Sequence, residues 1–196
     1  PNASEAVISM LAATSMGAVW SSCSPDFGVR GVLDRFGQIK PRILFAANAY
    51  LYNGKEFDCL EKIEKIAQSI PEIEKIVIIP FVKGYPVEIP ALKGRVIFWD
   101  EFIDPSAASL EFPRHSFNHP LYIMYSSGTT GIPKCIVHGV GGTLLQHAKE
   151  LMLHTELNRG DNIIYFTTCG WMMWNWLVSS LFVGATVTLF DGSPSY

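Results

Sequence analysis

Strand-like apolar runs and helix-like patterns alternate along the chain, and this alternation constrains the fold more than any other feature. The strongest apolar run is KIVIIPFV at 75–82, which suits a strand covered on both faces. The clearest helical pattern lies at 57–70, where apolar residues recur at spacings of three and four. Alternation of this kind predicts an α/β fold in which layered, largely parallel sheets are flanked by helices.

The other expected elements follow from the same patterns and from the breakers between them. Helices are predicted at 5–16, 25–35, 143–154 and 172–182. Strands are predicted at 18–21, 43–46, 95–99, 121–124, 135–137, 163–167 and 185–190. The segment 105–120 contains Pro105, Pro113 and Pro120 and is expected to be a loop.

The composition argues against several functional classes. Of the 196 residues 48% are hydrophobic, so a sizeable core can form. Lys plus Arg number 15 and Asp plus Glu 18, without a basic block, which argues against nucleic-acid binding and against a polybasic membrane patch. No apolar run reaches the roughly 18 residues of a membrane helix, so no membrane insertion is expected. The four cysteines lack CxxC spacing, which predicts reduced, mostly buried thiols in a cytoplasmic protein and no zinc site.

The run YSSGTTGIPK at 125–134 lies between two predicted strands and has the composition of an anion-binding loop. Its glycines allow backbone N–H groups to approach an anion, its hydroxyls add donors, and its lysine supplies a positive charge. The predicted phosphate-binding residues are Ser126, Ser127, Gly128, Thr129, Thr130, Gly131 and Lys134. Tyr125 is expected to anchor the loop in the core. Pro133 stands where a Walker A loop requires glycine, so a standard P-loop is excluded.

Composition alone is equally compatible with a flexible surface loop at this position. The apolar segments 121–124 and 135–137 on either side favour a loop that is held by buried strands. Cys135 is interpreted as a packing residue and His138 as a structural histidine. His147 and His154, seven residues apart, are expected on one face of a helix, without an acidic partner that would make a metal site.

The segment GWMMWNW at 170–176 is the second notable constellation. Trp171 and Trp174 are three residues apart, as are Met173 and Trp176, which is typical of a helix face buried in a core. From the residues alone the segment is therefore interpreted as an aromatic helix face that fills the core.

The loop resembles the phosphate-binding signature of the adenylate-forming superfamily, which includes the acyl-CoA synthetases: Tyr, Ser or Thr, SGTTG, any residue, then PKG. It departs from that signature at Cys135, where most of the superfamily has glycine. With this departure, the chain looks like the acyl-CoA synthetases that activate acetoacetate. The further motifs that carry this resemblance are PKCIVH at 133–138, GGTLLQH at 141–147, GWMMWNW at 170–176, YNGKEF at 52–57, DGSP at 191–194 and the first 36 residues.

The resemblance implies a two-step ligase reaction. ATP and acetoacetate would give an acyl-adenylate and pyrophosphate with the help of Mg²⁺, and the thiol of CoA would then displace AMP. The loop would hold the β and γ phosphates. Trp171, Met172 and Met173 would line a short acyl pocket, and Asn175 would offer its amide to the 3-keto oxygen of acetoacetate. An acetyl- or propionyl-CoA synthetase and a non-catalytic anion-binding domain are the alternatives.

The resemblance also implies that residues 1–196 form part of a large N-terminal AMP-dependent synthetase/ligase domain. The family's adenylation lysine belongs to a small C-terminal domain that this chain does not include, so no catalytic residue is predicted here. The chain alone is therefore expected to lack ligase activity and to expose a sheet edge and apolar surface.

Overall fold

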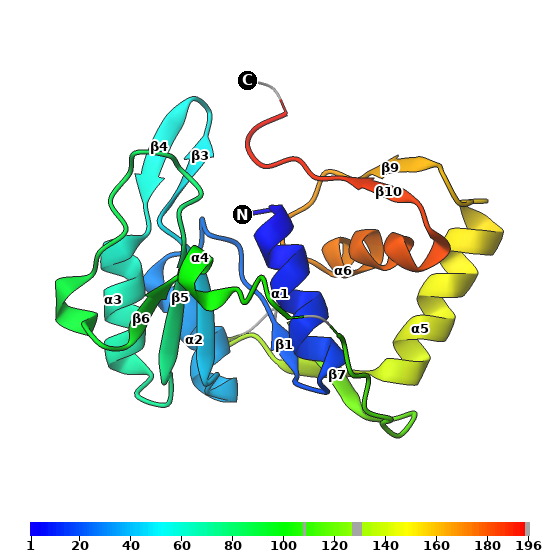
Figure 1. Cartoon of the computed structure of the whole chain (residues 1–196), viewed down its shortest axis with the longest axis horizontal. Coiled ribbons are helices and arrows are strands. Elements are labelled where there is room, and N and C mark those ends of the chain that lie inside the picture. Colours follow the sequence, from blue (N-terminus) through cyan, green and yellow to red (C-terminus); the bar gives the residue numbers. More distant parts are fainter. Residues whose placement is uncertain (108, 127–130, 195–196) are drawn as a thin grey trace.

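The computed structural model describes residues 1–107, 109–126 and 131–194 (Figure 1). Its helices are α1 (Ser4–Ser15), α2 (Val29–Ile39), α3 (Leu60–Ser69), α4 (Trp99–Phe102), α5 (Val140–Lys149) and α6 (Met172–Ser179), with the shorter turns η1 (Pro90–Leu92), η2 (Glu150–His154, a π-helix) and η3 (Ser180–Val183). Its strands are β1 (Trp20–Ser21), β2 (Ile43–Ala47), β3 (Ala49–Tyr52), β4 (Lys55–Asp58), β5 (Lys75–Ile79), β6 (Val96–Phe98), β7 (Pro120–Tyr125), β8 (Cys135–Gly139), β9 (Asn162–Ile164) and β10 (Thr186–Thr188).

A parallel sheet of order β2-β5-β6 forms one half of the molecule, on the left of Figure 1. Its middle strand β5 buries four consecutive residues because both of its faces are covered. Ile76 and Ile78 pack in a cluster with α2 and α3, whereas Val77 and Ile79 pack with Trp99 of α4. The prediction of a strand covered on both faces is confirmed for 75–79.

A second sheet of order β1-β7-β8 lies beside α1, α5 and α6, towards the other half of the molecule (Figure 1). Strand β1 pairs with β7 in parallel, and β7 pairs with β8 in antiparallel fashion. Tyr122 and Met124 of β7 pack with Met10 of α1 and with Trp174 and Val178 of α6. Strands β9 and β10 form a separate parallel pair. The predicted α/β class with largely parallel sheets flanked by helices is therefore confirmed.

The predicted helix at 57–70 is wrong at its start. Residues 49–58 form a β3–β4 hairpin, whose turn residues Asn53 and Gly54 have φ of +48° and +67°, as a tight hairpin turn of this kind requires. Phe57 belongs to β4 and stacks on Tyr50 with ring centroids 5.0 Å apart. The backbone N–H groups of Leu60 and its successor donate to the Asp58 carboxylate, so helix α3 begins only after this residue.

The expectation that buried segments border the loop on both sides is also wrong for the second segment. Cys135, Ile136 and Val137 of β8 are all exposed. Cys135 is therefore not a packing residue, whereas Cys59 and Cys169 are buried as expected and Cys23 is half-buried. In the part of the chain that the structure describes, no helix is long and apolar enough to cross a membrane.

Candidate phosphate-binding site

The predicted phosphate loop connects β7 to β8 at the closed end of an antiparallel hairpin. Tyr125 and Cys135 are paired in the ladder, and two further hydrogen bonds continue it. The Ser126 N–H donates to the Lys134 carbonyl oxygen at 3.0 Å, and the Lys134 N–H donates to the Ser126 Oγ at 3.3 Å. These bonds join the first and last predicted phosphate-binding residues across the neck of the loop.

The structure covers the predicted loop residues only in part. Ser127, Gly128, Thr129 and Thr130 lie outside the described residues. Gly131 and Lys134 are both exposed, which their predicted role requires. Lys134 forms no ion pair with a carboxylate among the described residues, so no acidic side chain there competes with an anionic ligand for its charge.

Tyr125 fixes the entrance of the loop and packs against the core as predicted. Its ring is half-buried against the cluster of α2, α3 and the parallel sheet. Its hydroxyl shares a hydrogen bond of 2.9 Å with the hydroxyl of Ser21, and burial raises its pKa well above the usual range. The phenol therefore stays neutral and serves as an anchor.

Two residues of α2 contact the loop that the sequence patterns do not single out. The Gln38 side-chain amide donates to the Pro133 carbonyl oxygen at 2.8 Å. The Arg35 guanidinium lies 5.8 Å from the centre of the Tyr125 ring. These contacts join residues about ninety positions apart, and no local spacing or composition indicates them.

The predicted acyl residues are placed at very different depths around the start of α6. Trp171 is 64% exposed and Met172 is 37% exposed, whereas Met173 is half-buried. Asn175 is fully buried; its Nδ2 donates to the Met124 Sδ at 3.2 Å, and its Oδ1 has no hydrogen-bond partner among the residues that the structure describes. The structure thus brings Asn175 against the strand that leads into the loop, while Trp171 and Met172 face solvent.

Strand β7 connects the two predicted subsites. Met124 points toward Asn175 and the core of α6, and the next residue, Tyr125, points toward α2. Alternate side chains of a strand lie on opposite faces, so these two neighbours enter different cores. The loop emerges where those cores meet.

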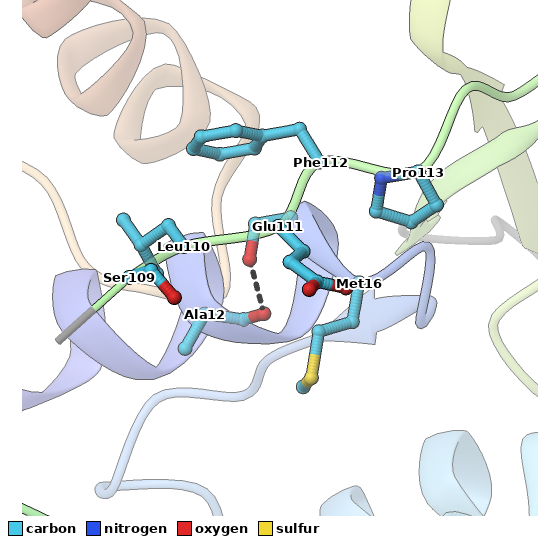
Figure 2. A pocket seen from close by; sticks show the side chains of 8 residues that line it. Ala12, Met16, Ser109, Leu110, Glu111, Phe112 and Pro113 are labelled. Atoms are coloured by element: carbon cyan, nitrogen blue, oxygen red, sulfur yellow. Dashed lines mark hydrogen bonds between the residues drawn. The ribbon is translucent and has the colours of Figure 1, made fainter. Parts of the chain in front are cut away.

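Two surface pockets lie away from the described residues of the predicted site. One of about 660 Å³ lies between α1 and the segment 109–113, where Leu110, Phe112 and Pro113 run past Ala12 and Met16 (Figure 2). A second of about 390 Å³ lies between α1, α5 and α6. Neither pocket is lined by a predicted phosphate or acyl residue that the structure describes.

The histidines near the site have structural surroundings. His138 is half-buried and its ring lies 5.1 Å from that of Tyr122. His147 is buried and its Nδ1 lies 2.7 Å from the Ser179 Oγ, whereas His154 is exposed. Among the described residues, no three His, Cys, Asp or Glu side chains are grouped so that they could hold a metal ion.

Comparison with known proteins places the chain in a family of enzymes. It matches the family described as AMP-binding enzyme over residues 1–196. It is 51% identical to acetoacetyl-CoA synthetase of Mus musculus over 199 residues, which cover 99% of this chain and 30% of the mouse protein. It is 47% identical to malonamoyl-CoA synthetase of Penicillium aethiopicum over 200 residues, which cover 100% of this chain and 28% of that protein.

A solved structure agrees with these relatives. Acetoacetyl-CoA synthetase from Streptomyces lividans superposes with a TM-score of 0.90 at 42% identity, over 99% of this chain and 29% of that one. The chain spans about 30% of the length of the curated relatives that it matches.

Proposed function

Because the chain belongs to the AMP-binding enzyme family, we propose that it supplies part of the N-terminal domain of a ligase that joins acetoacetate to CoA at the expense of ATP. One observation carries this proposal, namely 51% identity with an acetoacetyl-CoA synthetase across nearly the whole chain. The exposed, unpaired Lys134 at a hydrogen-bonded loop neck supports the assignment of the ATP phosphates to this loop.

The reaction would proceed in two steps. An acetoacetate carboxylate oxygen attacks the α-phosphorus of ATP, the bond to the pyrophosphate oxygen breaks, and an acyl-adenylate forms. The CoA sulfur then attacks the acyl carbon, the thiol proton is lost, and AMP leaves. Both substrates of the first step are anions, so positive charge and N–H donors at the β and γ phosphates favour their approach and the departure of pyrophosphate.

We assign these phosphates to Ser126, Ser127, Gly128, Thr129, Thr130, Gly131 and Lys134. When bound, Mg²⁺ would supply further charge neutralisation at the phosphate oxygens. The described residues offer no group of three His, Cys, Asp or Glu side chains that could hold the ion. The adenylation lysine would come from residues outside 1–196, and these residues alone are expected to form no acetoacetyl-CoA.

The names of two relatives narrow the class of acid. Acetoacetyl and malonamoyl groups are both short acyl chains with a carbonyl at carbon 3. We therefore propose a short 3-oxo acid as substrate, with Trp171, Met172 and Met173 limiting the pocket and Asn175 recognising the carbonyl. Asn175 suits this role because it is a buried amide whose polar atoms find only a thioether within the described residues. A buried group that pairs with the substrate carbonyl discriminates strongly against acids that lack it.

ATP–pyrophosphate exchange tests the activity in a protein of the relatives' length that contains this chain. Acetoacetate should support the fastest exchange, malonamate a slower one, and butyrate, acetate and propionate much slower ones. Fastest exchange with acetate or propionate would favour an acetyl- or propionyl-CoA synthetase instead. If none of these acids supported exchange, the alternative of a non-catalytic anion-binding domain would remain.

The Asn175 assignment has its own test. Asn175→Ala should reduce the preference for acetoacetate over butyrate, and Asn158→Ala, at an exposed position, should not. An unchanged preference in Asn175→Ala would remove this residue from the site.

We also propose a cytosolic location, which fractionation of cells that express the protein would check.

A further inference from the structure

Helix α2 holds the exit of the phosphate loop through Gln38. Both hydrogens of the Gln38 amide are used, because its Nε2 lies 2.6 Å from the Asp34 carbonyl oxygen and 2.8 Å from the Pro133 carbonyl oxygen. The first bond lies within the helix and sets the direction of the side chain. The second reaches a residue 95 positions away, at the peptide group that precedes Lys134.

This contact completes the fixation of one peptide group. The Pro133 carbonyl accepts from Gln38, and the N–H at the other side of the same peptide, that of Lys134, donates to the Ser126 Oγ. Since a peptide group is planar, holding both of its polar atoms fixes its orientation. The Lys134 carbonyl is held as well, by the Ser126 N–H. The backbone on either side of the Lys134 Cα is thus restrained, while its side chain remains exposed.

The same helix also contacts the entrance of the loop. Arg35, one turn before Gln38, lies between aromatic rings, 4.6 Å from the centre of Phe27 and 5.8 Å from that of Tyr125. Its Nη1 donates to the Gly31 carbonyl oxygen at 2.8 Å. The helix itself is seated in the core through Val32 and Phe36. A single rigid element therefore touches the residues that enter and leave the loop.

We propose that Gln38 is a positioning residue for the phosphate loop, which orients the Pro133–Lys134 peptide so that the lysine side chain is directed toward the β and γ phosphates of ATP. This inference rests on the proposed function, because it requires the loop to bind those phosphates. Gln38 would touch no substrate itself and would act through Lys134.

The test replaces Gln38 by Met, which has a similar length and helix propensity but no donor. In the protein of the relatives' length, the KM for ATP in pyrophosphate exchange should rise roughly twofold to tenfold, the factor that one neutral hydrogen bond is worth. The KM for acetoacetate should stay unchanged, and the melting temperature should fall no further than in the control variant that loses one side-chain hydrogen bond elsewhere. Affinity for AMP should also stay unchanged, because AMP lacks the two phosphates. Gln68→Met on α3 is the matched control, since the Gln68 amide bonds only within its own helix.

Gln38→Glu provides a second variant, because it keeps the length but places an acceptor against the Pro133 carbonyl; it should raise the KM for ATP at least as much. Unchanged ATP kinetics in both variants, or equal losses of ATP and AMP affinity, would overturn the inference. If the wild-type protein showed no pyrophosphate exchange with any acid, the proposed function would be overturned and this inference with it.

Discussion

The β2-β5-β6 sheet and the β7–β8 hairpin use their strands in opposite ways. Strand β5 buries Ile76, Val77, Ile78 and Ile79 in succession, whereas the first three residues of β8 are all exposed. The sheet is held by burial on both faces. In the hairpin only β7 contributes buried side chains, Tyr122 and Met124, among the described residues. The exposed start of β8 is held by its hydrogen-bond ladder to β7 and by Gln38, and the loop lies at the hairpin tip. Burial thus stabilises β5, whereas the proposed phosphate binding falls to the loop that joins β7 to β8.

The clearest way to break this comparison is to truncate one isoleucine in each region. Ile78→Ala in β5 should lower the free energy of unfolding by about 2–5 kcal/mol, because the side chain is fully buried and leaves a cavity. Ile136→Ala in β8, where the side chain is 47% exposed, should cost less than about 1 kcal/mol. Urea titration measures both; equal losses would mean that β8 is buried as deeply as β5.

Activity should depend more on the hairpin and its loop than on the buried sheet, which is the reverse of the order expected for stability. Lys134→Ala should lower kcat/KM for ATP about tenfold to a hundredfold, the worth of one charge-assisted hydrogen bond, and leave the melting temperature unchanged. Lys55→Ala, at an exposed position in the β3–β4 hairpin, is the control and should do neither. Initial rates of pyrophosphate exchange at varied ATP measure the effect, and an unaffected kcat/KM for ATP would remove Lys134 from the site.

A smaller effect, on the pH dependence of stability, is expected from His147 in α5, the helix that follows the β7–β8 hairpin. Burial, and next the nearby His138, lower the pKa of His147 below its usual 6.5, while Glu150 acts in the opposite direction. Because the folded-state pKa is the lower one, the stability contributed by neutral His147 is fully present above pH 6.5 and is lost as the pH falls through the folded-state pKa.

The measurement is the melting temperature at about pH 7.5 and about pH 5.5. His147→Gln should lose part of the decrease seen in the wild type on acidification, whereas His154→Gln, at an exposed position, should keep it. An identical decrease in all three proteins would contradict the prediction.

The smallest expected effect on stability comes from Cys135, whose thiol reactivity reports the difference in exposure between β8 and the core. Cys135 in β8 is exposed and should react quickly with a thiol reagent, whereas Cys59 and Cys169 are buried and should react only on unfolding. Cys23 should react slowly, because burial raises its pKa to about 12. Cys135→Ser should abolish the fast phase and change stability by less than about 0.5 kcal/mol. Fast labelling that persists in Cys135→Ser would show another accessible thiol.

The same contrast explains how much of the fold the sequence predicts. The run at 75–82 is almost continuously apolar and the pattern after Cys59 has helical spacing, and the structure confirms a strand at 75–79 and a helix at 60–69. The start of that helix was misplaced because Phe57 continues the apolar spacing, although the Asn53–Gly54 pair marks a hairpin turn. The apolar letters of β8 predicted burial, but exposure depends on what packs above a strand, which no local pattern contains.

The candidate site likewise contains some features that the sequence predicts and others that it does not. The loop is recognisable from its glycines, hydroxyls and lysine, because these residue types define the chemistry. Its supports Gln38 and Arg35 are not, because each contacts the hairpin across about ninety residues of chain. The depth of Asn175 was likewise hidden, since an asparagine in an aromatic segment gives no indication of which face it occupies.

The alternation along β7 has a consequence for how this chain can vary in length. Tyr122 and Met124 belong to the core of α6, and Tyr125 to that of α2. Inserting or deleting one residue within β7 would exchange these faces and turn the loop's first residue toward the wrong core. Natural insertions and deletions should therefore accumulate in the proline-containing segment 105–113 and be absent from 120–125, which makes the segment that precedes the loop a spacer of fixed length.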